Sequence, residues 1–556
     1  MPCWRDEAQQ GLRKSPVVES NRTAGRCDVH QGPRPPRGSA GSFLASVYFC
    51  CLCQVYFLLT SDRVAHWFVI PVVMCGVLIG IDGIDWLRGR RDIIDPAGII
   101  GLLGIHVFFL APLFQVAWDY SLLYVMPPDD WREWLGLMAL LNVLGLVVYL
   151  FSREWLAAQL AARRPRTVWR IDRERFALVV GLALLASALL QGFVYASYGG
   201  LSGYIDAFER DLQSDATSFQ GMGWVFMISE AFPILAMMAF AVLVWGRGRR
   251  PSLLAIGLVL LVFLALKIVF GGLRGSRSST VWALFWAVGI IHLRVRPIPR
   301  MLVGIGLVFL LAFIYAYGFY KNYGRDALDA LNAEARSEMT ARSSNRTLEA
   351  AILTDLGRAD IQAYLLFRLT GPAGGDYSYA WGKTYATTLA LLIPRAVWPG
   401  RPDNITQQGT EALYGRTAYW LQTTQASQVY GLAGEAMLNF GPVAAPVSYL
   451  VLGAVVALVS HWFRAWGPGD SRQMLLPFLI NFAFTVLTSD SDNDLFFLIK
   501  DGAVPSLVVF LGSRREAADG PGPPRASNLP AGRPTNRGRP PWSRSGCHSA
   551  APQGAG

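Results

Sequence analysis

Long runs of apolar residues alternate with short polar stretches over most of the chain, from about residue 43 to about residue 512. A helix crosses the apolar core of a bilayer with about 20 predominantly apolar residues, and runs of that order recur along this sequence. We therefore expect an all-α polytopic membrane protein with about twelve transmembrane helices. The predicted spans are 43–60, 64–81, 97–117, 134–151, 176–196, 223–245, 252–270, 279–293, 301–318, 437–459, 474–489 and 495–512.

The positions of the arginines predict how these spans are oriented, because cytoplasmic loops of membrane proteins carry an excess of Lys and Arg. Every even-numbered span is followed by a basic stretch, so both termini are predicted to be cytoplasmic. The arginines concerned are Arg88, Arg90, Arg91, Arg163, Arg164, Arg166, Arg170, Arg173, Arg175, Arg247, Arg249, Arg250, Arg294, Arg296, Arg300, Arg464, Arg472, Arg514 and Arg515.

The same pattern divides the chain into five parts. Residues 1–42 and 513–556 are polar and rich in Pro, Gly and Arg, so we expect two disordered cytoplasmic tails. Residues 43–320 carry spans one to nine, and residues 437–512 carry spans ten to twelve. Between them, residues 321–436 are predicted to form one large loop on the outer face of the membrane.

Composition narrows the class of protein further. The formal net charge of +11 does not indicate a nucleic-acid partner, because most of the excess arginine lies in short loops and in the tails. The seven cysteines are too scattered for a disulfide framework. The sequence contains no phosphate-binding P-loop, no dinucleotide fingerprint and no HExxH zinc motif, so neither a cofactor nor a metal is predicted.

The large loop contains a segment with helical periodicity between residues 345 and 369. Its apolar positions predict an amphipathic helix that lies on or against the membrane. These positions are Leu348, Ile352, Leu356, Ile361, Leu365 and Leu369. We expect Arg358, Asp360 and Arg368 on or near the polar side of this helix.

Further along the loop, Arg395 and Arg401 lie in a stretch with three prolines, at positions 394, 399 and 402. Proline fixes its own φ and restricts the residue before it, so the two guanidinium groups project from a stiff backbone. A rigid pair of arginines beside a membrane suits a lipid-borne phosphate. An interfacial loop with snorkelling arginines is the alternative, and these residues alone do not separate the two.

A second candidate for anion binding is the short outer turn GGLRGSRSS, residues 271–279. Its glycines allow close approach of a ligand, and a serine could cap the next helix, whose N-terminus favours anions. Arg274 and Arg277 add positive charge on the outer face, where the topology rule does not explain them. The alternative is a tight turn with two snorkelling arginines.

The remaining charged positions suggest where acid–base chemistry is located. The large loop contains no histidine, so a general base there has to be a carboxylate. Asp360 and Glu435 are the leading candidates for that role, and Arg358 is grouped with them as a candidate catalytic residue.

Other charges are expected to be less informative. Glu230 lies deep in span six and should face a cavity or a cation. Lys267, near the outer end of span seven, is expected to snorkel. The turn with Asp490, Asp492 and Asp494 is interpreted as solvated rather than as a cation site, because the glycine and distal glutamate of a calcium loop are missing.

Several short motifs lie in and around the large loop, one after another along the chain. They are Tyr198-Gly199-Gly200, Tyr204 and Arg210, the GSRSS turn, Gly382-Lys383-Thr384-Tyr385, Ile393-Pro394-Arg395, Trp398-Pro399-Gly400-Arg401-Pro402, Gly434-Glu435 and Asn439-Phe440-Gly441. In this order and topology, over residues 60–512, the chain resembles the Wzy-type polymerases of bacterial O-antigen and exopolysaccharide repeat units. Arg401 stands where many such proteins have a lysine, which keeps the charge but changes its geometry.

The resemblance implies a membrane glycosyltransferase of GT-C-like architecture in the bacterial inner membrane. Its substrate would be an undecaprenyl-diphosphate-linked oligosaccharide in membrane lipid, and a chain-length regulator would be a further partner. The growing glycan would pass from its lipid diphosphate to a sugar hydroxyl of the next repeat, with no nucleotide sugar and no cofactor. The implied diphosphate ligands are Arg274, Arg277, Lys383, Arg395 and Arg401, with Asp360 or Glu435 activating the acceptor hydroxyl.

Two alternatives stay open. A glycan ligase uses the same donor but another acceptor. Ligases that resemble these polymerases tend to use a histidine in the outer loop, and its absence here argues against one. A flippase would move lipid-linked oligosaccharide without chemistry and needs charges at mid-membrane depth. The predicted concentration of charge on one face favours an enzyme.

Overall fold

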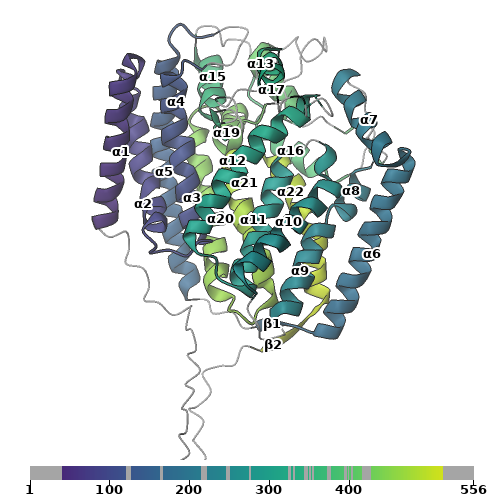
Figure 1. Ribbon diagram of the computed structural model, residues 1–556. Coiled ribbons are helices and arrows are strands. Elements are labelled where there is room, and N and C mark those ends of the chain that lie inside the picture. Colours follow the sequence, from purple (N-terminus) through teal and green to yellow (C-terminus); the bar gives the residue numbers. More distant parts are fainter. Residues whose placement is uncertain are drawn as a thin grey trace, which may run out of the picture.

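The structure is a computed structural model, and almost all of the described chain is helical (Figure 1). It describes residues 40–120, 127–162, 167–214, 222–245, 251–274, 277–323, 327, 329, 332–342, 349, 352–353, 356–371, 377–393, 397–398, 400–401, 405–415 and 428–517.

The helices before the large loop are α1 (Ala40–Thr60), α2 (Val69–Leu87), α3 (Pro96–Ile105), α4 (Ala111–Ala117), α5 (Trp131–Ala161), α6 (Arg173–Ser197), α7 (Gly200–Ser214), α8 (Gly223–Ser229), α9 (Phe232–Trp245), α10 (Leu253–Val269), α11 (Arg277–Ile290) and α12 (Arg300–Tyr323). Those of the loop are α13 (Ala333–Arg342), α15 (Ala359–Thr370), α16 (Lys383–Ala390), α17 (Thr406–Tyr414) and α19 (Gly431–Phe440). The last helices are α20 (Ala444–Ala465), α21 (Leu476–Thr488) and α22 (Ser491–Leu511). Shorter elements are the 3₁₀ or π segments η1 (Asp62–Val64), η2 (His106–Leu110), η3 (Gly272–Arg274), η4 (Ile291–Val295) and η7 (Ser471–Leu475), and the strands β1 (Thr167–Ile171) and β2 (Ser513–Ala517).

Helix lies at each of the twelve predicted spans, and nine helices in the described part of the chain are long and apolar enough to cross a bilayer. The chain is therefore a polytopic, multi-pass membrane protein. Helices α10 and α21 have only 17 and 13 residues, and α22 carries Asp492, Asp494, Lys500 and Asp501. These three fall outside the nine, so a count of twelve spans stays a prediction.

Local sequence explains where many helices begin. Five helical segments start behind an Asp or Ser whose side chain accepts a hydrogen bond from a backbone N–H of the first turn, which satisfies a donor that has no partner within the helix. These capping residues are Asp95, Asp130, Asp172, Ser252 and Asp470. In α3, Pro96 directly follows the capping residue, where its missing N–H costs nothing.

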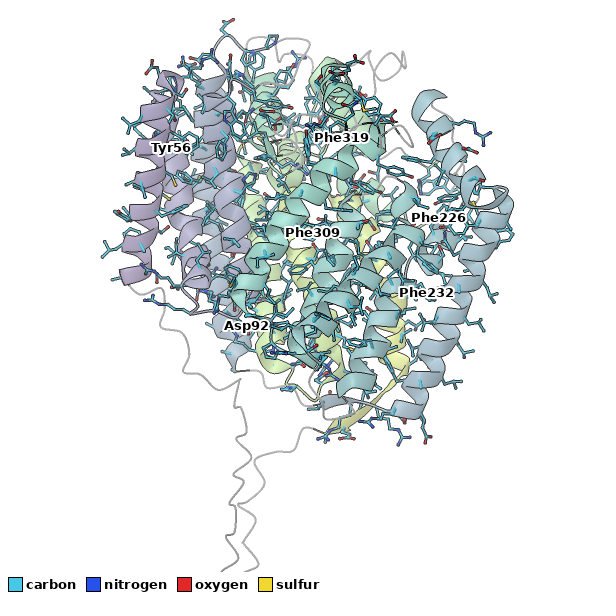
Figure 2. The ribbon with its side chains drawn as sticks, viewed as in Figure 1. Tyr56, Asp92, Phe226, Phe232, Phe309 and Phe319 are labelled. Atoms are coloured by element: carbon cyan, nitrogen blue, oxygen red, sulfur yellow. The ribbon has the colours of Figure 1, made fainter. Side chains whose placement is uncertain are left out.

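The membrane helices form two packed groups. Helices α1 to α5 pack with α20, and α6, α8, α9, α10 and α11 form a second group (Figure 1). Helix α21 joins the groups, because it contacts both α20 and α11, and α22 packs on α21 and on α6 and α8 of the second group. Large apolar side chains such as Tyr56 and Phe309 are exposed on the outside, as expected for surfaces that face lipid (Figure 2).

The described residues of the six even-numbered span exits lie together at one end of the molecule, which we call the sheet end; Arg163, Arg164, Arg166, Arg247, Arg249 and Arg250 lie outside the described residues. Side chains of Arg294, Arg296, Arg300 and Arg472 donate hydrogen bonds to backbone carbonyls of neighbouring exits, and β1 pairs with β2 in an antiparallel sheet. Helices α13, α15 and α17 lie at the opposite end, which we call the loop end (Figure 1). The arginine pattern thus correctly grouped the exits, and which end faces the cytoplasm stays a prediction.

Strand β2 differs from the sequence analysis, which assigned residues 513–517 to a disordered tail. The strand pairs residue by residue with β1, from Thr167 opposite Ala517 to Ile171 opposite Ser513. The Arg515 guanidinium also lies 4.8 Å from the ring centroid of Trp169. Backbone pairing and a cation–π contact therefore order five residues whose own composition favours disorder.

We expect a chain that stops after Gly512 to be less stable than the full chain by roughly 1–3 kcal/mol, because it loses every cross-strand pair of the small sheet. A chain that stops after Ala517 keeps the sheet and should unfold at the same temperature as the full chain. The measurement is thermal unfolding of the three purified chains in detergent. Equal unfolding temperatures for all three would show that the sheet contributes no stability.

Two expectations for the large loop were wrong. Of the predicted amphipathic helix over 345–369, residues 345–348, 350–351 and 354–355 lie outside the described residues, and α15 is buried from Asp360 to Phe367 between α5, α4, α17 and α19 instead of lying on the membrane. The predicted tenth span over 437–459 is interrupted, because α19 ends at Phe440 and Gly441 adopts φ +84° before α20 starts. Packing against other helices buries α15, whereas Gly441 in a left-handed conformation, followed by Pro442, ends α19.

Candidate functional site

Four carboxylates of the described chain are buried at the loop end, where α15, α19 and the turn between α21 and α22 pack together, and Asp492 is the least deeply buried of the four. The other three are Glu435 in α19, Asp490 before α22 and Asp360 in the first turn of α15. Their exposed fractions are 3%, 1% and 3%. Burial of unpaired carboxylates is costly, so each has to be explained by its partners or by a function.

Glu435 is fully engaged in hydrogen bonds. Its Oε1 accepts from Thr384 Oγ1 at 2.7 Å and from Ser491 Oγ at 2.6 Å, and its Oε2 accepts from Ser491 N at 2.7 Å. Burial raises the pKa of Glu435 in spite of these donors, which act in the opposite direction. This carboxylate therefore ties α16, α19 and α22 to one another.

The hydrogen bonds around Glu435 also connect two of the short sequence motifs. Gly382 begins α16 with φ +86°, a left-handed conformation that suits glycine, and donates its N–H to Asn439 Oδ1 at 2.9 Å. Asn439 Nδ2 donates to Thr384 Oγ1 at 2.7 Å. The Gly382–Tyr385 motif and the Asn439–Gly441 motif are thus parts of one hydrogen-bonded network around Glu435.

Asp490 lies beside Glu435. The expectation that this acidic turn is solvated was wrong, because Asp490 is buried. Its Oδ1 accepts from Tyr430 N and Gly431 N, both at 2.9 Å, while its Oδ2 has no partner among the described residues. Burial raises the pKa of Asp490 well above its usual range, and the neighbouring Glu435 and Asp492 raise it further. Nothing in the sequence around these three alternating carboxylates indicates that α15 and α19 cover them.

Asp360 has a free oxygen. Backbone N–H groups of Asp360 and Ile361 bond to its carboxylate, but its Oδ2 has no partner among the described residues. Burial raises the pKa of Asp360 to about 6, against the opposing effect of Arg358. This pKa lies close to the range in which a general base works at neutral pH.

Arg358 connects the two parts of this cluster. Its Nε donates to the Thr488 carbonyl at 2.8 Å, which places the guanidinium next to the turn that carries Asp490. Its charge acts on both Asp360 and Asp490, and Asp490 in turn interacts with Glu435. The structure therefore brings together all three residues that the sequence analysis grouped as candidate catalytic residues, with Asp490 between them.

The predicted diphosphate ligands are less clustered. Lys383 Nζ is 3.5 Å from Gln407 Oε1. Arg401 donates from its NH1 to the carbonyls of Leu391 and Ile393, at 3.3 and 3.1 Å, so it holds the chain that follows α16. Arg395 lies outside the described residues, as do the side chains of Arg274 and Arg277.

The backbone of the glycine turn is described up to residue 274, and tyrosines hold it. Gly271 has φ +122°. The Tyr317 hydroxyl donates to the Gly272 carbonyl, and the Tyr320 hydroxyl donates to the Leu273 carbonyl at 3.0 Å. The turn is thus a firmly supported backbone segment directly before α11.

Charged residues also lie inside the membrane domain. Lys500 Nζ is 3.0 Å from Glu230 Oε2, so the prediction that Glu230 faces a cation or a cavity is confirmed. Lys267 is only 3% exposed and lines the same cavity as Glu230, Lys500 and Asp501, so the snorkelling interpretation of Lys267 was wrong. The Lys267 side chain therefore points toward the acidic residues of this cavity and does not extend to the membrane surface.

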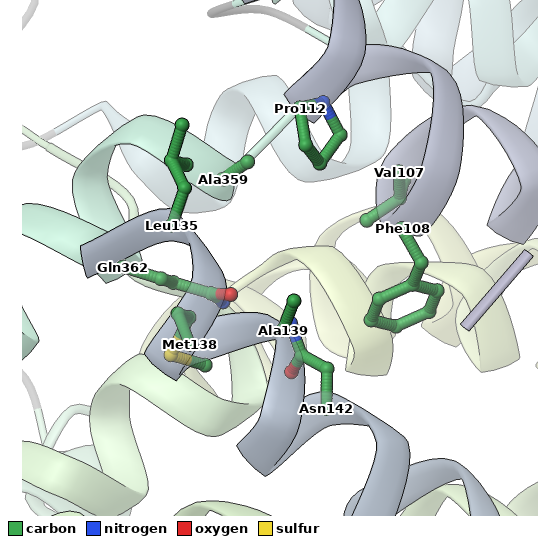
Figure 3. A pocket seen from close by; sticks show the side chains of 9 residues that line it. All are labelled: Val107, Phe108, Pro112, Leu135, Met138, Ala139, Asn142, Ala359 and Gln362. Carbon is green, nitrogen blue, oxygen red and sulfur yellow. The ribbon is translucent and has the colours of Figure 1, made fainter. Parts of the chain in front are cut away.

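A mainly apolar cavity lies beside the first turn of α15 (Figure 3). Its two amides are already engaged, because Asn142 Oδ1 accepts from Tyr449 and Gln362 Nε2 donates to the Tyr430 carbonyl, both at 2.8 Å. The lining residues are Val107, Phe108, Pro112, Leu135, Met138, Ala139, Asn142, Ala359 and Gln362. Within the described ranges, no group of three or more His, Cys, Asp or Glu side chains could hold a metal ion.

Comparison of the chain with models of protein families, with curated proteins and with solved structures finds no match. Only the residues of the site therefore support a function for this chain.

Proposed function

We propose that the protein polymerises undecaprenyl-diphosphate-linked oligosaccharide repeat units, as a twelve-span membrane glycosyltransferase of GT-C-like architecture. The observation that supports this proposal most directly is the environment of Asp360. Asp360 is a buried carboxylate at the loop end with one oxygen free of hydrogen bonds and a pKa of about 6. Such a group is suited to accept the proton of a sugar hydroxyl at neutral pH.

Asp360 is a better general base than Glu435 in this arrangement. Both oxygens of Glu435 already accept hydrogen bonds, from Thr384 and from Ser491. Proton transfer to Glu435 would weaken contacts that hold three helices together, whereas Asp360 Oδ2 has no such contact to lose. Glu435 and Asp490 then act as the frame that keeps α15 in place.

The leaving group of the reaction is a lipid diphosphate, whose negative charge grows as the glycosidic bond breaks. Fixed guanidinium groups stabilise such charge most strongly in the transition state. Arg274, Arg277 and Arg395 are the arginines that we assign to this task, with Lys383 beside them. Arg401 is already bonded to two backbone carbonyls, so its contribution is to hold the loop.

A flippase for lipid-linked oligosaccharide is the second candidate, and one observation favours it. Glu230, Lys267, Lys500 and Asp501 lie around one cavity in the membrane domain, and charges at that depth are typical of transport paths. A ligase remains the third, although residues 321–436 contain no histidine.

The test is reconstitution of the purified full chain in liposomes with lipid-linked repeat units as the sole substrate. A polymerase produces a ladder of longer glycans on the lipid diphosphate. A flippase moves single units between leaflets and forms no glycosidic bond, and a ligase forms no ladder without a different acceptor. In cells, loss of the gene should cause single lipid-linked repeats to accumulate on the outer face of the membrane.

We expect Arg277→Lys and Arg395→Lys each to lower kcat/KM for polymer formation by about 10-fold or more, equivalent to roughly 1.4 kcal/mol or above. A guanidinium grips a diphosphate with paired, directional hydrogen bonds that an ammonium group cannot reproduce. The matched control is Arg464→Lys, an exposed arginine in the last turn of α20 at the sheet end, which should be silent. Wild-type rates in both test variants would contradict diphosphate binding by these arginines.

A further inference from the structure

The ion pair between Glu230 and Lys500 lies beneath the glycine turn. Glu230 is located at the break between α8 and α9, and its Oε2 is 3.0 Å from Lys500 Nζ of α22. The Glu230 side chain is 4% exposed and the Lys500 side chain 14%. An unpaired buried charge is costly, so this contact holds Glu230 and Lys500 together, in a cavity that Lys267 and Asp501 also line.

The backbone of the turn lies directly against the carboxylate of this pair. A Cβ atom added to Gly271 would come within 2.7 Å of Glu230 Cδ, and Gly271 has φ +122°. Only glycine therefore allows the turn to approach Glu230 so closely. Tyr195 from α6 and Tyr317 and Tyr320 from α12 hold carbonyls on either side of Gly271.

The helix that follows the turn rests on the same cavity. Ser279, in the first turn of α11, lines this cavity together with Glu230 and Lys500. Asn481 from α21 also lines it, and its Oδ1 is buried without a partner among the described residues. The ionic cavity thus contacts the chain both before and after the turn that carries Arg274 and Arg277.

We infer that Glu230, held by Lys500, is a positioning residue that sets the location of the glycine turn and of the start of α11. It acts through the turn and does not touch substrate. The consequence for substrate rests on the proposed function, because a displaced turn would no longer present Arg274 and Arg277 to a lipid diphosphate. The position of the turn itself is independent of that function.

The first measurement is the mobility of a spin label at Ser278→Cys, an exposed position next to Arg277, in full-length protein whose seven native cysteines are replaced. Glu230→Gln should raise the mobility of the label, with about a 3-fold shorter correlation time. The charge-exchanged double variant Glu230→Lys/Lys500→Glu should restore it. The control is Asp82→Asn, which breaks the buried ion pairs of Asp82 with Arg91 and Arg153 near the sheet end and should leave the label unchanged.

The second measurement is polymer formation by the same variants without the label. Glu230→Gln should lower kcat/KM for the lipid-linked donor by about 10-fold, because displaced Arg274 and Arg277 no longer stabilise the charge that grows on the leaving diphosphate. The charge-exchanged double variant should return kcat/KM to within about 3-fold of the wild-type value.

An unchanged label in folded Glu230→Gln overturns the inference, and so does equal loosening in Asp82→Asn, which would indicate a general loss of order. If Glu230→Gln does not fold, Glu230→Leu/Lys500→Leu replaces it, since that variant contains no unpaired charge; an immobile label there overturns the inference. A mobile turn with unchanged kcat/KM overturns the link to substrate. Wild-type protein that makes no polymer overturns the proposed function and leaves the label result standing.

Discussion

Asp360→Asn should lower the rate of polymer formation by about 100-fold or more, because a positioned general base typically contributes a factor of that size. Asparagine has nearly the same shape and can still accept the backbone hydrogen bonds that Asp360 receives from its own N–H and that of Ile361. Donor binding should therefore change little, so the loss should appear in kcat. Single-turnover assays with reconstituted protein measure both quantities.

The pH dependence gives this prediction a second, independent result. The pKa of Asp360 is raised to about 6, so wild-type activity should rise with pH through about 6 and then level off as the base ionises. The residual activity of Asp360→Asn should lack this step. A step that persists in the variant would assign the titration to another group.

Stability should change in the opposite direction. A carboxyl whose pKa is raised from 3.8 to about 6 on folding contributes stability below pH 3.8 that is lost as the pH rises through about 6. At pH 7.5 the ionised form is therefore destabilising, on the order of 3 kcal/mol from the size of the shift. Asp360→Asn should unfold at a higher temperature than wild type at pH 7.5, and this advantage should vanish near pH 4.

The matched control is Asp329→Asn, which removes an exposed carboxylate from the same loop. It should alter neither turnover nor the unfolding temperature. Full activity in Asp360→Asn would contradict the assignment of the base, whatever its effect on stability.

Glu435→Ala should destabilise the protein by on the order of 3 kcal/mol, because it leaves three donors in a buried site without an acceptor. The donors are Thr384 Oγ1, Ser491 Oγ and Ser491 N. Thermal or denaturant unfolding in detergent should show the change. Thr384→Val removes one of these bonds and also the acceptor of the bond from Asn439 Nδ2, and should cost about 1–2 kcal/mol.

Two comparisons make the Glu435 prediction specific. Glu411→Ala in α17 removes a glutamate that accepts one hydrogen bond, from Gln407 Nε2 at 3.0 Å, and should cost less than about 1 kcal/mol. In the double variant Glu435→Ala/Thr384→Val the two costs should not add, because both variants remove the same bond. Additive costs would mean that Glu435 and Thr384 stabilise the fold independently.

Asp360 and Glu435 thus lie in one buried cluster, yet their removal should have opposite effects on stability. The difference comes from their hydrogen bonds. Glu435 accepts three bonds from side chains and backbone of other helices, whereas Asp360 Oδ2 accepts none. Sequence alone did not separate the two, since the large loop contains no histidine and either carboxylate could serve as the base.

Several features of the fold could be predicted because they depend on short stretches of chain. The membrane helices follow from the length of apolar runs, and the grouping of the arginine-rich exits follows from a rule about charge next to such runs. Glu230 is a further case, because a charge deep in a span needs a partner whatever the fold. Lys500 is that partner.

Other features could not be predicted because distant segments produce them. Lys267 was expected to snorkel, but its surroundings come from α8, α9, α11, α21 and α22. Strand β2 forms because β1, far away in the sequence, offers it a pairing edge. The helix break at Gly441 lies within an apolar run that hydropathy alone extends without interruption.

What the sequence by itself determined is therefore the membrane character of the chain, the position of its helices and the residue types that are available at the loop end. Hydropathy and charge act locally, so they can be recognised in a linear sequence. The tertiary structure alone decided which acids are buried. The turn at Asp490 is covered only because α15 and α19 pack onto it, and Arg358 reaches the Thr488 carbonyl across that packing. Desolvation depends on every neighbour in space, so the raised pKa values of Asp360, Glu435 and Asp490 became evident only in the folded chain.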